Sequence, residues 1–175
     1  MINTTYVKKE HFLECNKLIY KYYFTPFITI YEILMALFVL FLIYLEKYIF
    51  MSVFIVIMIG FPFLIELLSR RKIKQTVDVL FKKEDDGFIY DYDFNEDSFK
   101  VKIIYKDKSK EYNFKNNKVK RIIENDDSIY IFVDRETCFY VSKLGFEKYD
   151  KLTFQSYFSL KIKKYEVNKW QSYSI

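Results

Sequence analysis

Residues 27–68 read FITIYEILMALFVLFLIYLEKYIFMSVFIVIMIGFPFLIELL. The stretch holds two apolar runs, Phe27–Leu45 and Tyr48–Leu68, which only Glu46 and Lys47 separate. Each run is long enough to cross the hydrocarbon of a bilayer, which takes about 20 helical residues. Leu, Ile, Phe and Val fill most positions, so neither run has the polar face that a helix of a soluble protein turns to water. We therefore predict a membrane-spanning helical hairpin.

The charges beside the two runs predict the orientation of this hairpin. Four lysines precede the first run: Lys8, Lys9, Lys17 and Lys21. Four basic residues follow the second run: Arg70, Arg71, Lys72 and Lys74. Lysine and arginine stay on the cytoplasmic side, so we expect both termini in the cytoplasm and a tight turn outside. The first run begins too late and is too long for a cleavable signal peptide.

Two carboxylates, Glu32 and Glu66, interrupt the apolar runs. Counting the helical rise from each end of the hairpin places both in the inner-leaflet third, at comparable depth. One interpretation is a protonatable or cation-binding pair inside an oligomer. The simpler interpretation, which we favour, is that each glutamate reaches the membrane surface and meets Arg70, Arg71 or a lysine.

The segment before the hairpin combines two patterns. Residues 1–6 alternate apolar and polar side chains, which indicates a short strand. From Lys8 the apolar residues fall at helical spacing on a basic helix. This helix suits either the membrane surface or packing on a soluble domain, and the pattern does not separate the two.

After the hairpin, the second helix is expected to continue through Ser69–Phe81, and beyond Gly87 the apolar period becomes two. Six short strands are predicted, at Phe88–Phe94, Phe99–Ile103, Tyr112–Phe114, Val119–Glu124, Ile129–Val133 and Cys138–Ser142. An apolar stripe from Phe154 to Tyr165 then predicts a C-terminal helix. The economical arrangement is one strongly bent antiparallel sheet capped by that helix, without a second sheet. The predicted fold is thus a membrane helical hairpin plus an α+β cytoplasmic domain, divided at residues 1–25, 26–83 and 84–175.

The distribution of charge suggests which surfaces meet the membrane and which meet a partner. The basic residues expected at the inner leaflet are Arg70, Arg71, Lys72, Lys74, Lys161, Lys163 and Lys164. The acids expected to face a protein partner are Asp91, Asp93, Glu96 and Asp97. Anionic lipid head groups would then mainly position the domain. Nucleic acid is not an expected partner, because the chain lacks a basic stripe with stacking platforms.

Catalytic and metal-binding patterns are missing from the sequence. Cys15 and Cys138 are far apart and form neither a disulfide framework nor a CxxC metal site. His11 is the single histidine, and we expect it to be an exposed or half-buried helix residue. The three glycines form no phosphate-binding loop. We therefore expect no enzyme activity, no metal and no cofactor.

One block of the sequence resembles a known family. It comprises residues 119–124 (VKRIIE), 130–132 (YIF), 140–143 (YVSK) and Phe146. This block, together with the order of the parts along nearly the whole chain, resembles the YcxB-like family of small bacterial membrane proteins. A tryptophan that the family often carries just before the first of these strands is absent here, near Asn116. The resemblance implies a bacterial cell-membrane protein with two spans and a cytoplasmic domain similar to a pleckstrin-homology (PH) fold, and it implies no site residues.

Three functions remain open at this stage. The first is a non-catalytic, membrane-anchored interaction module whose PH-like domain binds a protein partner at the inner leaflet. The second is an immunity protein that neutralises a toxin at the membrane, which a neighbouring toxin gene would favour. The third is an ion or proton path through a homo-oligomer that uses Glu32 and Glu66.

Overall fold

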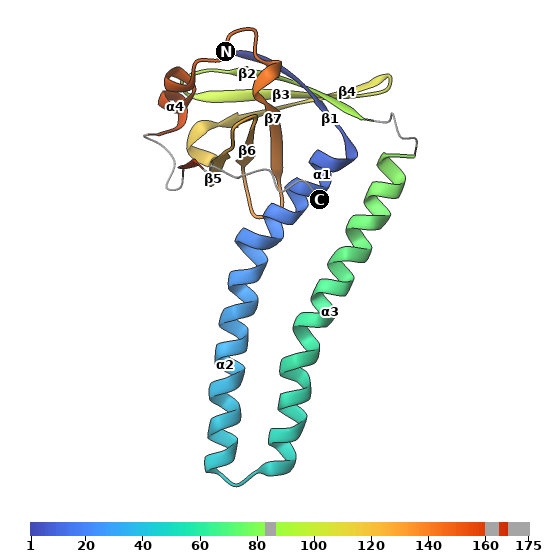
Figure 1. Cartoon of the computed structure of the whole chain (residues 1–175), viewed down its shortest axis with the longest axis vertical. Coiled ribbons are helices and arrows are strands. Elements are labelled where there is room, and N and C mark those ends of the chain that lie inside the picture. Colours follow the sequence, from blue (N-terminus) through green and yellow to red (C-terminus); the bar gives the residue numbers. More distant parts are fainter. Residues whose placement is uncertain (83–86, 160–164, 168–175) are drawn as a thin grey trace. The chain divides into compact units, whose positions relative to one another are not determined.

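The computed structural model describes residues 1–82, 87–159 and 165–167. The chain forms two compact units, and Figure 1 colours the chain by position in the sequence. One unit combines Met1–Ile19 with Leu80–Ile175, and we call it the sandwich unit. The other unit is Tyr20–Val79, and we call it the hairpin unit.

The hairpin unit contains helices α2 (Thr25–Tyr44) and α3 (Tyr48–Leu80), and α3 ends at the boundary with the sandwich unit. A short π-helical turn, η1 (Tyr20–Phe24), precedes α2. Pro26 explains this turn, because proline has no backbone N–H and its ring crowds the carbonyl four residues earlier. The predicted helical extension beyond the second apolar run is confirmed, since α3 continues to Leu80.

Helices α2 and α3 lie antiparallel and contact each other through aromatic rings. Tyr31 packs on Phe61 and Phe38 packs on Phe54, each pair at a centroid distance of 4.8 Å. Most other apolar side chains of the two helices are exposed. Both helices are long and apolar enough to cross a membrane, and almost none of their apolar stretches is buried within the protein. A core helix of a soluble protein would bury these side chains instead.

A tight turn joins the two helices. The backbone N–H of Glu46 donates to Ile43 O, and that of Lys47 donates to Leu42 O, both at 2.9 Å. These two bonds form a Schellman motif, which closes a helix with one residue in the left-handed region. Glu46 occupies that position with φ of 56°. The predicted tight connection is therefore present.

In the sandwich unit, the first sheet has the strand order β1-β2-β3-β4 and is antiparallel throughout. Its strands are β1 (Ile2–Val7), β2 (Phe88–Phe94), β3 (Ser98–Tyr105) and β4 (Lys108–Lys115). The N-terminal strand is thus confirmed, and it pairs with the first strand after the hairpin. The whole hairpin unit is inserted between two neighbouring strands of one sheet.

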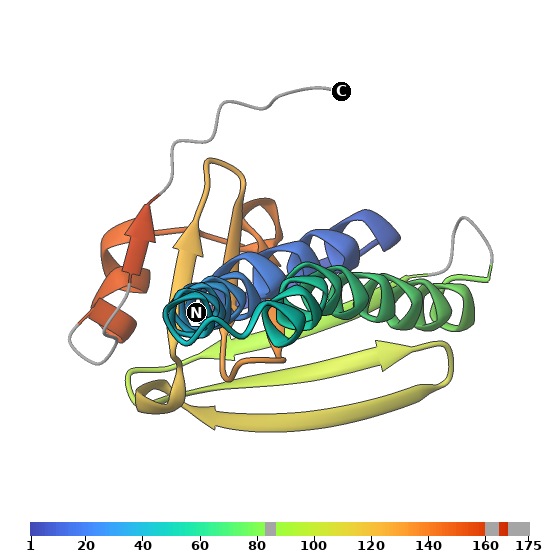
Figure 2. The same cartoon turned by 90° about the horizontal axis from the view of Figure 1, so that it is seen from below.

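The second sheet has the order β7-β6-β5-β8. Its strands are β5 (Arg121–Glu124), β6 (Ser128–Phe132), β7 (Cys138–Ser142) and β8 (Tyr165–Val167). Strand β8 runs parallel to β5, and Figure 2 shows it as the red arrow at the edge of this sheet. The prediction of one bent sheet without a second sheet was wrong. Every residue of β6 is buried, so this strand needs covering on both faces.

The core lies between the two sheets and is rich in aromatic rings. Helix α4 (Lys151–Ser159) contributes Phe154 and Phe158, which pack on Phe94 at centroid distances of 5.2 and 6.2 Å. All three side chains are fully buried. The predicted C-terminal helix is present, but Tyr165, which we expected on its apolar stripe, belongs to β8.

Helix α1 (Lys9–Ile19) packs on the sandwich through strand β7. Its Phe12 lies 5.8 Å from the ring of Phe81, and its Cys15 is buried. Of the two placements that the sequence left open for this helix, the structure shows packing on the folded domain. Two short 3-10 turns complete the unit, η2 (Asn116–Lys118) and η3 (Lys143–Gly145).

Candidate functional site

A cavity of about 510 Å³ lies inside the sandwich unit. The first sheet lines it with Tyr90 of β2, Ile103 of β3 and Phe114 of β4. Strand β7 contributes Phe139, and helix α1 contributes Phe12. Its volume falls in the range of small-molecule sites, and its walls have the mainly apolar and aromatic character of such sites.

The rings around this cavity contact one another and form a continuous wall. Phe139 lies 6.1 Å from Tyr90 and 5.5 Å from Phe114, measured between ring centroids. Tyr112 stacks beside Phe114 at 6.1 Å. The period-two pattern of β2, β3 and β4 turns these side chains to one face of the sheet, because alternate residues point the same way.

Both cysteines reach the wall of this cavity, Cys15 from α1 and Cys138 from β7. The sequence separation hid this pairing, since the contact depends on how α1 packs on the sheet. Both are free thiols. Burial raises the pKa of the Cys138 thiol, and its interaction with Cys15 raises it further. A buried thiol with a raised pKa stays neutral and is a weak nucleophile.

His11 stacks on the ring of Tyr140, with 4.0 Å between centroids and an angle of 13° between planes. Burial lowers the pKa of His11, although Glu14 and Glu10 partly offset this effect. The imidazole is therefore mainly neutral at pH 7. The predicted half-buried position on the helix is confirmed.

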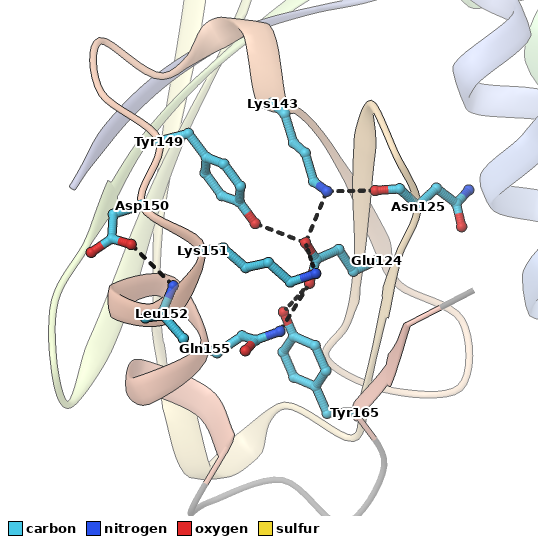
Figure 3. A network of polar contacts seen from close by, with 9 residues as sticks. All are labelled: Glu124, Asn125, Lys143, Tyr149, Asp150, Lys151, Leu152, Gln155 and Tyr165. Carbon is cyan, nitrogen blue, oxygen red and sulfur yellow. Dashed lines mark hydrogen bonds and ion pairs between the residues drawn. The ribbon is translucent and has the colours of Figure 1, made fainter. Parts of the chain in front are cut away.

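A second polar centre surrounds Glu124, whose side chain is fully buried at the end of β5 (Figure 3). Its carboxylate accepts hydrogen bonds from the hydroxyls of Tyr149 at 2.9 Å and Tyr165 at 2.8 Å. Lys143 Nζ lies 2.8 Å from Glu124 Oε1. Gln155 donates to Glu124 Oε2 at 3.3 Å. One carboxylate thus connects β5, η3, α4 and β8.

The electrostatics of Glu124 reflect these partners. Burial alone would raise its pKa, but hydrogen bonds from Lys143, Tyr165 and Tyr149 outweigh burial and lower it. Burial and the neighbouring carboxylate raise the pKa of both tyrosines. The carboxylate is therefore ionised and the phenols neutral at pH 7, which favours a structural role over proton transfer.

Sequence reasoning missed this centre. Glu124 ends the short strand Arg121–Glu124, in which every residue is buried and no face is left for solvent. A carboxylate in such a strand needs hydrogen-bonding partners. The sequence shows the glutamate beside Ile122 and Ile123, but the burial of the whole strand and the partners from three later segments are seen only in the structure.

The four acids expected to bind a partner lie near one another on the first sheet. Asp91 and Asp93 are on β2, and Glu96 and Asp97 form the turn into β3. Lysines stand directly across from the first two, with Lys102 opposite Asp91 and Lys100 opposite Asp93. Asp91 also accepts a hydrogen bond from Thr4 Oγ1 at 3.0 Å. The surface therefore alternates positive and negative charge.

The basic residues expected at the membrane lie in two places. Arg70, Arg71, Lys72 and Lys74 are exposed side chains of α3. Lys161, Lys163 and Lys164 lie outside the described residues.

The two glutamates of the hairpin are not level with each other. Glu66 pairs with Arg70 on the same helix, at 2.6 Å, as the simpler interpretation expects. The contacts Tyr31–Phe61 and Phe38–Phe54 place residue 60 of α3 beside Glu32. Glu66 is six residues further along, an axial offset of about 9 Å. This offset weighs against a shared cation between the two carboxylates of one chain.

No group of His, Cys, Asp or Glu side chains suited to a metal ion occurs among the described residues. No protein-family model, curated protein or solved structure matched the chain. The resemblance to the YcxB-like family thus stays a prediction from the sequence.

Proposed function

We propose that this chain is a non-catalytic, membrane-anchored interaction module. The hairpin unit would span the cytoplasmic membrane, and the sandwich unit would bind a protein partner at the inner leaflet. The observation that carries the proposal is the insertion of an exposed apolar hairpin between β1 and β2, two paired strands of one folded unit.

This insertion favours a hairpin that crosses the membrane twice. Val7 lies opposite Phe88 in the ladder of β1 and β2. The two ends of the hairpin therefore connect to the same folded unit, which lies on one side of a membrane. Two crossings return the chain to that side, whereas one crossing would separate β1 from β2. The flanking lysines and arginines assign this side to the cytoplasm.

The arrangement of the sandwich unit is consistent with a PH-like domain. Two packed sheets with helix α4 after the strands of the antiparallel meander support this part of the proposal, although the sequence led us to expect a single bent sheet. We assign the binding surface to the outer side of the first sheet, around Asp91, Asp93, Glu96 and Asp97. Its alternating acids and lysines suit a protein of complementary charge pattern better than a uniformly anionic lipid surface.

Thiol labelling tests the membrane part of the proposal. Both native cysteines are replaced by alanine, and one new cysteine is introduced, either Lys47→Cys in the hairpin turn or Asp126→Cys in the sandwich. A membrane-impermeant maleimide should label the first variant in intact cells and the second only after lysis. The reverse pattern contradicts the orientation, and labelling of both only after lysis contradicts the span.

Site-specific crosslinking tests the partner. A photo-crosslinking amino acid at Lys100 should capture a defined protein. Replacing the four acids by Asn or Gln should abolish this product. The matched control changes four other exposed acids in the same way and should retain it: Asp107, Asp126, Asp127 and Glu147. A crosslink that survives the first replacement, or a domain that binds anionic vesicles and no protein, contradicts the assignment.

A further inference from the structure

The cavity of the sandwich unit has no role in the proposed function. We propose that it binds a small molecule with an apolar body and a cationic end of the quaternary-ammonium type. All residues that line it belong to Met1–Ile19 and Leu80–Ile175, so the inference is independent of the membrane hairpin.

The size and the walls of the cavity indicate an apolar body. Its volume of about 510 Å³ exceeds the space that one or two waters fill. Val7, Ile19 and Ile103 line it alongside the aromatic rings. Apolar surface of this kind gains free energy when a ligand displaces water from it.

The aromatic wall indicates the charge of the other end. Six of the residues that line the cavity are aromatic: Phe12, Tyr90, Tyr112, Phe114, Phe139 and Tyr140. Ring faces carry a negative electrostatic potential, and they bind organic cations such as quaternary ammonium groups. The same faces give no such attraction to a carboxylate.

The polar lining agrees with this sign. Glu136, an exposed residue of the turn before β7, is the one acidic or basic residue among the described residues that line the cavity. The other polar residues of the lining are Thr137, Asn16, the two cysteines and the three tyrosines, and none of them is a Lys, Arg, His, Asp or Glu. A carboxylate-ended ligand such as a fatty acid would be repelled by Glu136 and would find no Lys, Arg or His among the described residues of the lining.

Three soluble probes of similar size test the inference on the purified full chain: benzyltrimethylammonium, benzyl alcohol and phenylacetate. Their dissociation constants are measured by ligand-observed NMR titration. We expect the ammonium to bind about tenfold more tightly than the alcohol, and phenylacetate to bind weakest. Equal affinities, a preference for phenylacetate, or no binding of the ammonium to the folded protein would overturn the proposal.

Two pairs of variants locate the binding. Glu136 is exposed, and Glu136→Lys should weaken ammonium binding about tenfold. Asp126→Lys makes the same charge change in a turn that does not line the cavity, so it should leave the binding unchanged. Ile103→Trp should fill the cavity and abolish binding. Its neighbour Ile104 points to the opposite face of β3, so Ile104→Trp should preserve binding. Affinity that is unaffected by both Glu136→Lys and Ile103→Trp, in variants with unchanged circular dichroism, contradicts the site.

Discussion

Val7 and Phe88 lie opposite each other in the ladder of β1 and β2, although the whole hairpin unit separates them along the chain. This pairing makes the N-terminal segment part of the sandwich. Asn3, Thr5 and Val7 are all buried there. Asn3 Nδ2 donates to Ser142 O at 2.8 Å, which connects β1 to strand β7 of the other sheet.

The first prediction concerns a version of the protein without its hairpin. A chain that joins Met1–Ile19 to Leu80–Ile175 through a flexible Gly/Ser linker should be soluble, β-rich and monomeric. The fragment from Gly87 to Ile175 lacks β1 and α1, exposes the edge of β2 and opens the cavity, so it should aggregate. Circular dichroism and size-exclusion chromatography distinguish the two. A stable monomeric fragment would show that β1 is dispensable.

The second prediction concerns pH. The pKa of Glu124 is lower in the folded protein than its ordinary value of 4.5, so its contribution to stability is present above that value. The contribution is lost as the pH falls through the folded pKa. Glu124→Gln should therefore destabilise the linker-joined chain strongly at pH 7 and progressively less below pH 4.5. Urea unfolding of both proteins from pH 7 to about pH 3 measures this difference.

If the free energy of unfolding differed by the same amount between the unchanged protein and Glu124→Gln at every pH in this range, the ionised network would be contradicted. The matched control is Asp126→Asn, which removes an exposed carboxylate in the turn after β5. Its effect on the free energy of unfolding should stay within about 0.5 kcal/mol at every pH.

The sequence predicted the parts of the fold that depend on local pattern. The apolar runs follow from their length and continuous apolar composition, and the short strands and the helix around Phe154 follow from periodicity; each segment carries these signals by itself. Three features depend on contacts between distant segments and were missed: the division into two sheets, the strand at Tyr165 and the meeting of Cys15 with Cys138. Tyr165 fits a helical stripe equally well, and its place is shown by the pairing of β8 with β5 and by its hydrogen bond to Glu124.

The third prediction concerns Asn116, a buried side chain in the turn η2. Its Nδ2 donates to the carbonyls of Asn95 at 2.9 Å, Glu96 at 3.0 Å and Tyr157 at 3.2 Å. Asn116→Ala leaves these carbonyls without that donor and should lower the free energy of unfolding by about 2–3 kcal/mol. Asn117 is the exposed neighbour, and Asn117→Ala should cost less than about 0.5 kcal/mol. Equal effects of the two substitutions in urea unfolding would contradict this account.

The last prediction concerns Lys106, which has φ of 53° in the two-residue turn between β3 and β4. A side chain in this left-handed region costs about 1 kcal/mol, which glycine avoids. Lys106 Nζ also lies 5.0 Å from the Tyr105 ring, so replacing the lysine removes that contact as well. Both Lys106→Gly and Lys106→Ala lose this contact, because neither residue carries a charge, so the difference between the two variants does not include it. Lys106→Gly should therefore be more stable than Lys106→Ala by about 1 kcal/mol in urea unfolding of the linker-joined chain.

Asp107, the second residue of the turn, is the control. Its φ is not positive, so the order of glycine and alanine should reverse there, since glycine loses backbone entropy without relieving strain. The same order at both positions would show that the turn does not hold Lys106 in the left-handed region in solution.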